Sequence, residues 1–474
     1  MNFQSISFLA FLAVTVAVCL PVGARRRQLG AALLTLACLW FCVVGMGLRG
    51  LAVLAAGLGV TALALRPLAG KRERGRRTAL VLACLWHIGM LTVFKYAGFF
   101  SGGAFSIGWA PLGLSFFTFQ QLWLLKEAYT RQYVPARGDN LVLYAFFFPV
   151  VVSGPILRPG AFFPQLRGET FLRAGWQDAA AGLYLICIGM AKKTLLAEGF
   201  GVIVNNGYAH PEWLNSVSAA MVVLGYTLQL YFDFSGYCDV ATGCARLLGI
   251  RLPVNFNSPY RSLSVGEFWK RWHMTLTSFL RECLYFPLGG SKKGRLRAYG
   301  NILIVFLVSG LWHGAGWTFL LWGLLHGLAQ VAERLLGQRL EKLPRWLRWG
   351  LTFAFVNLAW IYFRAPTVAA GNRILGALFS LDFAKPMPWL SEGLFTCEQE
   401  IIRILLPPIA LYRNLLTTAA LYIVGLIAAL WPRNAVAEAD RFRPTFWRGA
   451  GMWVLGVWAV LSFNGIAQFI YANF

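Results

Sequence analysis

Long apolar runs recur along the whole chain, and they restrict its possible folds more than any other feature. The first three cover residues 6–22, 29–48 and 51–65. One helix needs about 20 predominantly apolar residues to cross the hydrocarbon core of a bilayer. Hydrophobic residues make up 58% of the chain and charged residues only 13%, against about 25% charged residues in soluble domains. The sequence therefore predicts an all-α, polytopic integral membrane protein.

Further apolar runs bring the expected number of spans to about ten to twelve. They cover residues 79–94, 112–125, 179–191, 218–232, 301–311, 319–331, 349–363, 415–431 and 452–463. The run 141–163 is interrupted by SGPILRPG at 153–160, and prolines with Arg158 in such a run indicate a broken or re-entrant element. Residues 366–412 contain several prolines and are expected to form interfacial or extramembrane helices.

The chain is expected to form one membrane domain over residues 1–474. Within it we distinguish N-terminal spans (1–137), a central region (138–335) and C-terminal spans (336–474).

The run 79–94 is expected to cross outward, and the run 112–125 to cross back toward the basic residues Lys126, Arg131 and Arg137.

The formal net charge of +24 does not indicate nucleic-acid binding. The basic residues fall in short loops between apolar runs, namely RRR (25–27), KRERGRR (71–77) and SKKGRLR (291–297). The positive-inside rule and anionic lipid headgroups explain that distribution. We expect the first apolar run to be an uncleaved span, with the N-terminus outside and the loops 25–27 and 71–77 both on the cytoplasmic side.

The nine cysteines are scattered, mostly inside apolar runs, and show no CxxC spacing. An odd, scattered set argues against a disulfide framework and against a zinc site. We expect no metal site.

Polar residues concentrate in one stretch of this apolar chain, residues 231–327. It contains YFDFSGY (231–237), EFWKRWH (267–273) and LWHGAGW (311–317). An unpaired charge or imidazole between membrane-spanning segments costs several kcal/mol, so such a residue is a functional-site candidate by default. The stretch is interpreted as an active site inside a membrane.

Three of the five histidines lie in this stretch. His313 ends an apolar run beside Trp312, and Gly314 and Gly316 after it permit close approach of another helix or a substrate. Neutral imidazole is a common general base near pH 7, although a histidine bonded across helices is the plainer alternative. His326 follows on a different helix face and is given a secondary role; His87 and His210 are expected to be structural.

His273 belongs to a segment with its own helix-start signal, because Ser264 and Glu267 have the spacing of a capping box. On a continuous helix Trp269 and His273 share a face, and Glu267 can pair with Arg271. Lys270 and Arg271 must line a cavity or lie at the cytoplasmic surface. The segment could position a phosphate-bearing donor or could be an interfacial helix, and the residues alone do not decide.

Asp233 and Asp239 flank Gly236 at the end of an apolar run. Two such acids could hold a cation or a proton, as in a transporter, or could pair with Arg246 and Arg251. We favour pairing, because the arginines follow closely.

Several segments together resemble the membrane-bound O-acyltransferases (MBOAT), in particular their bacterial alginate and peptidoglycan O-acetylation branch. They are PLGLSFFTFQ (111–120), FFPVVVSGPILRP (147–159), QLYFDFSGYCDVATGCARLLGI (229–250), NFNSPYRSLSVGEFWKRWHMTLTSFLRECLYFPLGG (255–290), LWHGAGWTFLLWGLLHG (311–327) and FIY (469–471). The D-alanylation proteins of teichoic acid are more distantly similar. In the family pattern an Asp and an aromatic residue are expected where this chain has Glu282 and Cys283, and Ser is common at Cys238. Cys283 could carry an acyl group, but a packing substitution is the favoured interpretation.

The resemblance implies a funnel-shaped helical fold with a thin central partition, re-entrant or interfacial helices and a multi-pass location in a bacterial cytoplasmic membrane, in contact with its lipids. It assigns the catalytic role to His313 and a second functional role to His273. The expected substrate-binding residues are Trp269, Lys270, Arg271, Trp312, Asp233, Tyr237 and Asn257.

The implied reaction moves an acetyl group from a cytoplasmic thioester to a glycan outside. No bound cofactor is expected; acetyl-CoA is the expected donor substrate, with a phosphopantetheine carrier as the alternative. An extracytoplasmic SGNH-type O-acetyltransferase is the expected partner. Transfer of D-alanine from a carrier protein to teichoic acid is the nearest rival function, and a transporter without chemistry is another.

Overall fold

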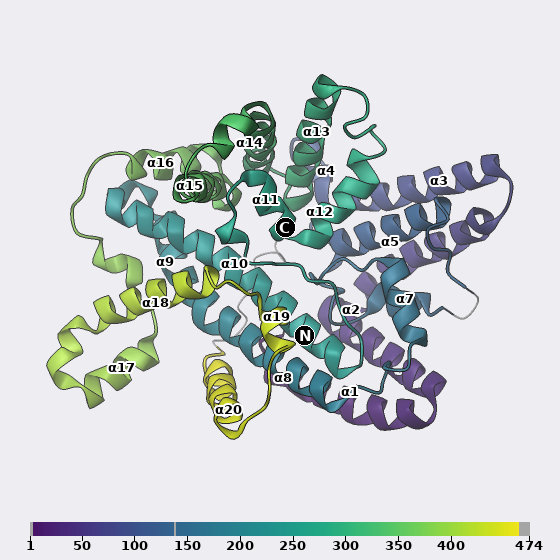
Figure 1. The fold of residues 1–474 in the computed structure, drawn as a ribbon, viewed down its shortest axis with the longest axis horizontal. Coiled ribbons are helices and arrows are strands. Elements are labelled where there is room, and N and C mark those ends of the chain that lie inside the picture. Colours follow the sequence, from purple (N-terminus) through teal and green to yellow (C-terminus); the bar gives the residue numbers. More distant parts are fainter. Residues whose placement is uncertain (1–2, 137–138, 464–474) are drawn as a thin grey trace.

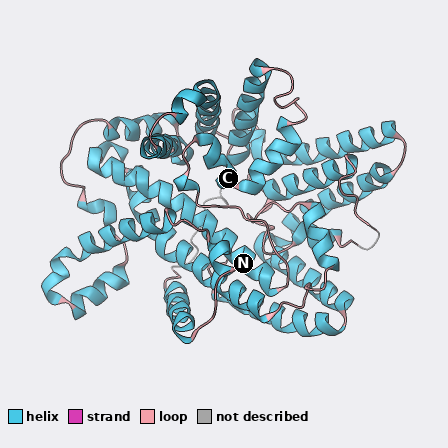
Figure 2. Cartoon of the chain, in the orientation of Figure 1, coloured by secondary structure: helices cyan, strands magenta, loops and turns pink. Residues whose placement is uncertain are grey.

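The computed structural model describes residues 3–136 and 139–463. Figures 1 and 2 show that this part of the chain consists of helices and connecting loops, with no strand. The predicted all-α class is confirmed. The basic Arg137 and the motif at 469–471 lie outside the described residues.

The first helices match the predicted spans. α1 (Ile6–Arg25) starts at Ser5, whose side chain accepts a hydrogen bond from the amide of Phe8. α2 (Arg27–Ala69) has 43 residues and is interrupted at Gly47, where φ is 71°. At 1.5 Å per residue it would measure about 65 Å, about twice the hydrocarbon core of a bilayer. The interruption falls one residue before the end of the predicted span 29–48 and shortly before the next, 51–65, so α2 accounts for both.

The predicted interruption of the run 141–163 is present as a non-helical segment between α6 and α7. α3 (Glu73–Leu91) continues through a π-helical turn (Thr92–Tyr96) into α4 (Ala97–Phe100), and α5 (Leu114–Tyr129), α6 (Leu141–Phe146) and α7 (Pro159–Arg167) come next. Between α6 and α7 the buried residues 147–157 form no helix. The amide of Ile156 donates to Thr275 Oγ1 at 3.1 Å, so protein groups take the place of water for this buried backbone.

α10 (Ser216–Leu247) runs through the middle of the molecule (Figure 1) and is buried over most of its length. It packs along α8 (Trp176–Ala191), which continues through a π-helical segment (Lys192–Ala197) into α9 (Glu198–Ala209). A Cβ atom at Gly189 would lie 2.6 Å from the carbonyl oxygen of Gly236. Glycine at this crossing therefore permits close contact of the two backbones.

The second half of the chain surrounds α10. α11 (Val265–Arg271) and α12 (Met274–Leu280) form a short hairpin that ends in a π-helical turn (Arg281–Tyr285). The remaining helices are α13 (Arg295–His313), α14 (Trp317–Glu341), α15 (Arg345–Arg364), α16 (Val368–Leu378), α17 (Thr396–Leu405), α18 (Arg413–Ala429), α19 (Ala435–Ala439) and α20 (Phe446–Leu461). α17 and α18 extend to the left in Figure 1. α17 lies in the segment expected to hold interfacial helices, and α18 coincides with the predicted span 415–431.

Seven helices of the described chain are long and apolar enough to cross a membrane, counting α2 once and the continuous helices 73–100 and 176–209 once each. The expected number was ten to twelve. α5 and α20 coincide with further predicted spans but have only 16 residues each, and α14 and α15 are not apolar enough to qualify.

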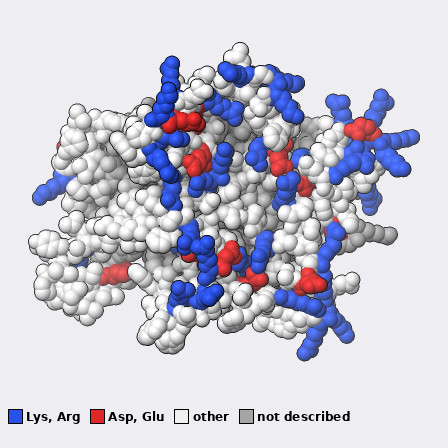
Figure 3. Space-filling model, viewed as in Figure 1, with Lys and Arg blue, Asp and Glu red and all other residues white. Residues whose placement is uncertain are grey.

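Basic loops that are distant in sequence lie against one another. Arg131 donates to the carbonyl oxygen of Gly70 at 3.2 Å, and Arg27 donates to that of Gly168 at 3.0 Å. Figure 3 shows Lys and Arg side chains spread over the face in view. The first contact joins the segments after α2 and α5, and the second joins those after α1 and α7. Contact within each pair is expected for loops on one side of a membrane.

Candidate active site

His273 lies at a sharp break in the chain, which the sequence did not predict. α11 ends at Arg271, Trp272 is extended, and His273 adopts a left-handed conformation with φ of 44° before α12 begins. The expectation that Trp269 and His273 share one helix face was wrong, because no single helix contains both. Left-handed backbone is rare for residues other than glycine, and it concentrates at functional sites.

Other features of this segment are confirmed. The side chain of Ser264 accepts a hydrogen bond from the amide of Glu267 at 3.0 Å, which caps α11. Glu267 pairs with Arg271 one turn later, at 2.8 Å.

Asn255 holds the imidazole of His273 in one orientation. Its Oδ1 accepts hydrogen bonds from the amide and hydroxyl of Thr275, at 3.2 and 2.9 Å, and lies 3.2 Å from His273 Nδ1. Because a backbone amide can only donate, the atom is identified as oxygen, and His273 Nδ1 must carry the proton. Among the described residues Nε2 of this fully buried ring has no hydrogen-bond partner, so it is available to accept a proton.

His313 is the last residue of α13 and is 2% exposed. Its ring packs edge-on against Trp322 and Phe363, with centroids 5.1 Å away in both cases. A Cβ atom at Gly314 would lie 2.1 Å from the Phe319 ring. Glycine after His313 therefore lets α14 turn back closely on the end of α13.

Trp312 joins the two predicted histidines. Its ring centroid lies 4.8 Å from that of His313 and 6.2 Å from that of His273. The structure thus brings three predicted site residues from two distant segments into one buried cluster, which we call the histidine pair with Trp312.

Trp269 lies beside the third histidine of the central stretch. Its indole N–H donates to His326 Nδ1 at 3.2 Å, and both side chains are buried. His326 thus positions Trp269, which is consistent with the secondary role expected of it.

Asp233 and Asp239 are paired, but the predicted partners were wrong. Asp233 forms a buried ion pair with Lys193, and Asp239 lies 2.6 Å from Lys192 Nζ. Arg246 instead pairs with Asp440. It follows Asp239 by seven residues on α10, about 10 Å along the axis, whereas the lysines come from the helix packed alongside.

Three further candidate residues lie away from the histidine pair. Tyr237 stacks on Phe3, with ring centroids 4.5 Å apart. The backbone amide of Asn257 donates to the carbonyl oxygen of Arg271, and its side-chain oxygen accepts a hydrogen bond from the side chain of Asn434. Asn257 thus braces the end of α11. Lys270 is exposed.

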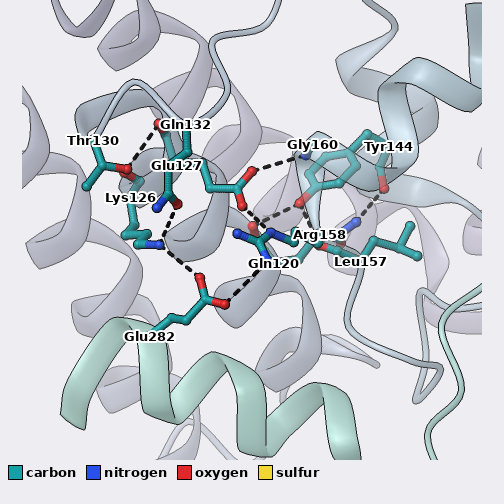
Figure 4. A network of polar contacts seen from close by, with 10 residues as sticks. All are labelled: Gln120, Lys126, Glu127, Thr130, Gln132, Tyr144, Leu157, Arg158, Gly160 and Glu282. Atoms are coloured by element: carbon teal, nitrogen blue, oxygen red, sulfur yellow. Dashed lines mark hydrogen bonds and ion pairs between the residues drawn. The ribbon is translucent and has the colours of Figure 1, made fainter. Parts of the chain in front are cut away.

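A polar network fastens the non-helical segment and the turn after α12 to α5 (Figure 4). Lys126 contacts Glu282 at 2.9 Å, and Arg158 contacts both Glu282, at 3.4 Å, and Glu127. Partial burial opposes the charged form of Arg158, but the hydrogen bond and the charge of Glu127 outweigh it and raise the pKa of Arg158. Glu282, one of the departures from the family pattern, thus has a structural role.

A largely apolar cavity of about 170 Å³ lies between α12, α13 and α14. We call it the α13 slot. Its apolar lining includes Trp269, Leu276, Leu280, Ile302, Val305 and Phe306. Ser309, which also lines it, stands one helical turn before His313. Arg281 and Arg334 supply positive charge, and Arg334 also lines two wider cavities, of about 400 and 590 Å³.

Sequence reasoning missed two residues of this site. Asn255 orients His273, and its signal was its place in the NFNSPY motif. Lys95, whose ammonium contacts the end of α13, directly follows the apolar run 79–94, and a lysine beside a membrane span is a functional candidate. In residues 3–136 and 139–463 no group of three or more His, Cys, Asp or Glu residues is arranged to hold a metal ion.

Comparison with known proteins shows which family this chain is similar to. Residues 139–368 match the model of MBOAT, the membrane-bound O-acyltransferase family. The chain is 36% identical over 335 residues to the peptidoglycan O-acetyltransferase of Helicobacter pylori, covering 62% of this chain and 63% of that protein. It is 37% identical over 281 residues to "Probable alginate O-acetylase AlgI" of Pseudomonas fluorescens, covering 57% and 54%.

A more distant relative is the teichoic acid D-alanyltransferase of Bacillus subtilis, 29% identical over 262 residues, covering 52% of this chain and 65% of that protein. The chain spans less than two thirds of the length of each of these relatives.

Proposed function

Because the chain contains an MBOAT domain over residues 139–368, we propose that it is a membrane O-acetyltransferase. It moves an acetyl group from a cytoplasmic thioester across the membrane for O-acetylation of an exopolysaccharide or cell-wall glycan. The observation that carries this proposal is the histidine pair with Trp312, which is buried among aromatic side chains. A buried pair of imidazoles suits proton transfer during acyl transfer, and the α13 slot reaches Ser309, one helical turn before His313.

The proposed chemistry uses His313 as general base. Its imidazole takes the proton of an acceptor hydroxyl while the hydroxyl oxygen attacks the thioester carbonyl, and the bond to sulfur breaks as the thiolate leaves. His273, with Nε2 available, is positioned to donate to or accept from the reacting groups once it exchanges a proton. The apolar surroundings exclude water, which would otherwise hydrolyse the thioester.

The relatives support acetyl transfer over its rival. Identity is 36–37% to the two O-acetylation proteins and 29% to the D-alanyltransferase. We therefore propose acetyl as the group moved, and an extracytoplasmic SGNH-type transferase as the protein that passes it to the polymer. Assays should accordingly be made with such a partner present.

The basic loops of the chain support entry of the donor from the cytoplasm. Loops rich in Lys and Arg are retained on the cytoplasmic side of a membrane, and the loops that contact one another belong to this class. The α13 slot combines a narrow apolar lining with two arginines. That combination suits a thioester on a flexible pantetheine arm, with phosphate groups that remain at the arginines.

We expect Arg281→Gln and Arg334→Gln each to raise KM for acetyl-CoA about tenfold with little change in kcat, since one charge-assisted contact to phosphate contributes about 1.5 kcal/mol. Initial rates of acetyl transfer in membrane vesicles measure this. Arg297→Gln, at an exposed arginine outside the slot, is the matched control. Unchanged KM in both slot variants would contradict entry of acetyl-CoA by this route. Activity with an acylated carrier protein but not with acetyl-CoA would favour the rival donor.

Cys283→Ser is expected to keep transfer within about twofold of the wild type. Burial raises the pKa of Cys283 to about 12, so at neutral pH it remains a thiol, and the thiolate is the nucleophile in acyl exchange. Trapping of labelled protein after acid quenching provides a second measurement. Loss of transfer in a folded Cys283→Ser protein, together with label on the wild-type thiol, would instead establish an acyl carrier.

A further inference from the structure

Lys95 connects α3 to the end of α13, although the two are more than two hundred residues apart in sequence. Its Nζ donates to the carbonyl oxygens of Trp312 and His313, the latter at 3.4 Å, and to Ser115 Oγ at 3.3 Å. The same ammonium lies 5.8 Å from the centroid of the Trp312 ring. One side chain thus contacts both residues that end α13.

The surroundings of Lys95 explain how a charge is accommodated here. In the part of the chain that the structure describes, no carboxylate pairs with it. The last carbonyl groups of a helix have no partner within the helix and carry partial negative charge, so a cation at this end is stabilised. Its contacts to the carbonyls and to Ser115 therefore replace an ion pair.

The contacts of Lys95 hold α13 at the residue where the helix ends. Gly314 is extended, with φ of −165°, so the helix stops at His313. Because glycine is conformationally permissive, Gly314 restrains the backbone after His313 less than another residue would. Lys95 itself lies in the π-helical turn 92–96, and single π-helical turns occur frequently at functional sites.

We infer that Lys95 is a positioning residue for acyl transfer. It holds the carbonyl end of α13, and through it the His313 ring, in the orientation that the reaction requires. The inference rests on the proposed role of His313. Lys95 acts through α13, so its loss should affect the reaction step more than donor binding.

Values of kcat and KM for acetyl transfer by Lys95→Met and Lys95→Arg test whether Lys95 affects the reaction step more than donor binding. Methionine keeps the length of the side chain without its charge, and we expect kcat to fall 10- to 100-fold with KM for acetyl-CoA within twofold of the wild type. Arginine retains a cation with donors and should recover most of the lost kcat. Lys71→Met, at an exposed lysine of a basic loop, is the matched control. Wild-type kcat in Lys95→Met, or a change confined to KM, would overturn the inference.

Hydrogen exchange tests the tether independently of activity. In Lys95→Met the amides of the last turn of α13 should exchange at least tenfold faster, while those of its first turns remain unchanged. Unchanged exchange would overturn the inference even if activity fell. Faster exchange throughout the protein, with Arg failing to restore kcat, would assign Lys95 to general stability. If the wild type transfers no acetyl group while exchange responds as expected, the tether stands, but the positioning role and the proposed function both fail.

Discussion

His313→Ala is expected to abolish acetyl transfer, lowering kcat by about a thousandfold or more, while the protein remains folded. A positioned general base contributes about 10²- to 10⁴-fold, and the rings of Trp312, Trp322 and Phe363 that pack against His313 are not bases. Alanine also leaves a cavity beside Trp312 and Trp322, so His313→Asn, which fills more of the space without a basic nitrogen, should be equally inactive. Acetyl transfer in vesicles and elution as a single species in detergent measure activity and folding separately.

His210→Ala is the matched control for this experiment. His210 is half-exposed, lies beside Glu212 and is distant in the sequence from the central stretch. It should retain wild-type transfer. More than a tenth of wild-type activity in His313→Asn would remove His313 from the role of base, and His273, whose Nε2 is available, would become the residue to test next.

Asp233→Ala is expected to cause the largest loss of stability among the candidate site residues. Lys193 and Asp233 form an ion pair with side chains only 3% and 6% exposed. Removal of one partner leaves a buried charge without its counterion, which typically costs about 3–5 kcal/mol. Thermal unfolding in detergent should show a clearly lower midpoint for Asp233→Ala and for Lys193→Ala.

Two variants make this prediction specific. Lys193→Met combined with Asp233→Leu removes both charges and should recover most of the lost stability, because two apolar side chains of similar size leave no charge unpaired. Glu400→Gln breaks a solvent-exposed pair with Arg403 and should change the midpoint little. If Asp233→Asn keeps wild-type stability but loses transfer, Asp233 binds substrate, as the family resemblance suggested.

The helical class and the central role of the polar stretch were predictable from the sequence, for a physical reason. Apolar runs of bilayer length leave few alternatives to helices, and an imidazole between such runs needs a function or a partner. The motifs at 267–273 and 311–317 stand out in the sequence for their polar residues, whereas their proximity depends on the fold. Trp312 between the two histidines is a consequence of that proximity.

Tertiary packing accounts for the features that the sequence did not reveal. The partners of Asp233 and Asp239 come from the helix packed alongside α10. Lys192 and Lys193 directly follow the apolar run 179–191, and Lys95 directly follows the run 79–94. The left-handed conformation of His273 has no signal in residue type, because its stability depends on bonds from Asn255. Nearness in the chain was therefore a poor guide to pairing, whereas a search for lysines at the ends of apolar runs would have found all three.

The most direct test of the central claim is the sidedness of transfer by the wild-type protein. Inverted sealed vesicles containing the protein, its candidate partner transferase and enclosed acceptor glycan are given radiolabelled acetyl-CoA on their outer, cytoplasmic face. The account predicts label on the enclosed glycan as alkali-labile ester, with none in vesicles that carry His313→Ala. Label that reaches the interior only as intact donor, equally with both proteins, would contradict it and would establish transport without chemistry.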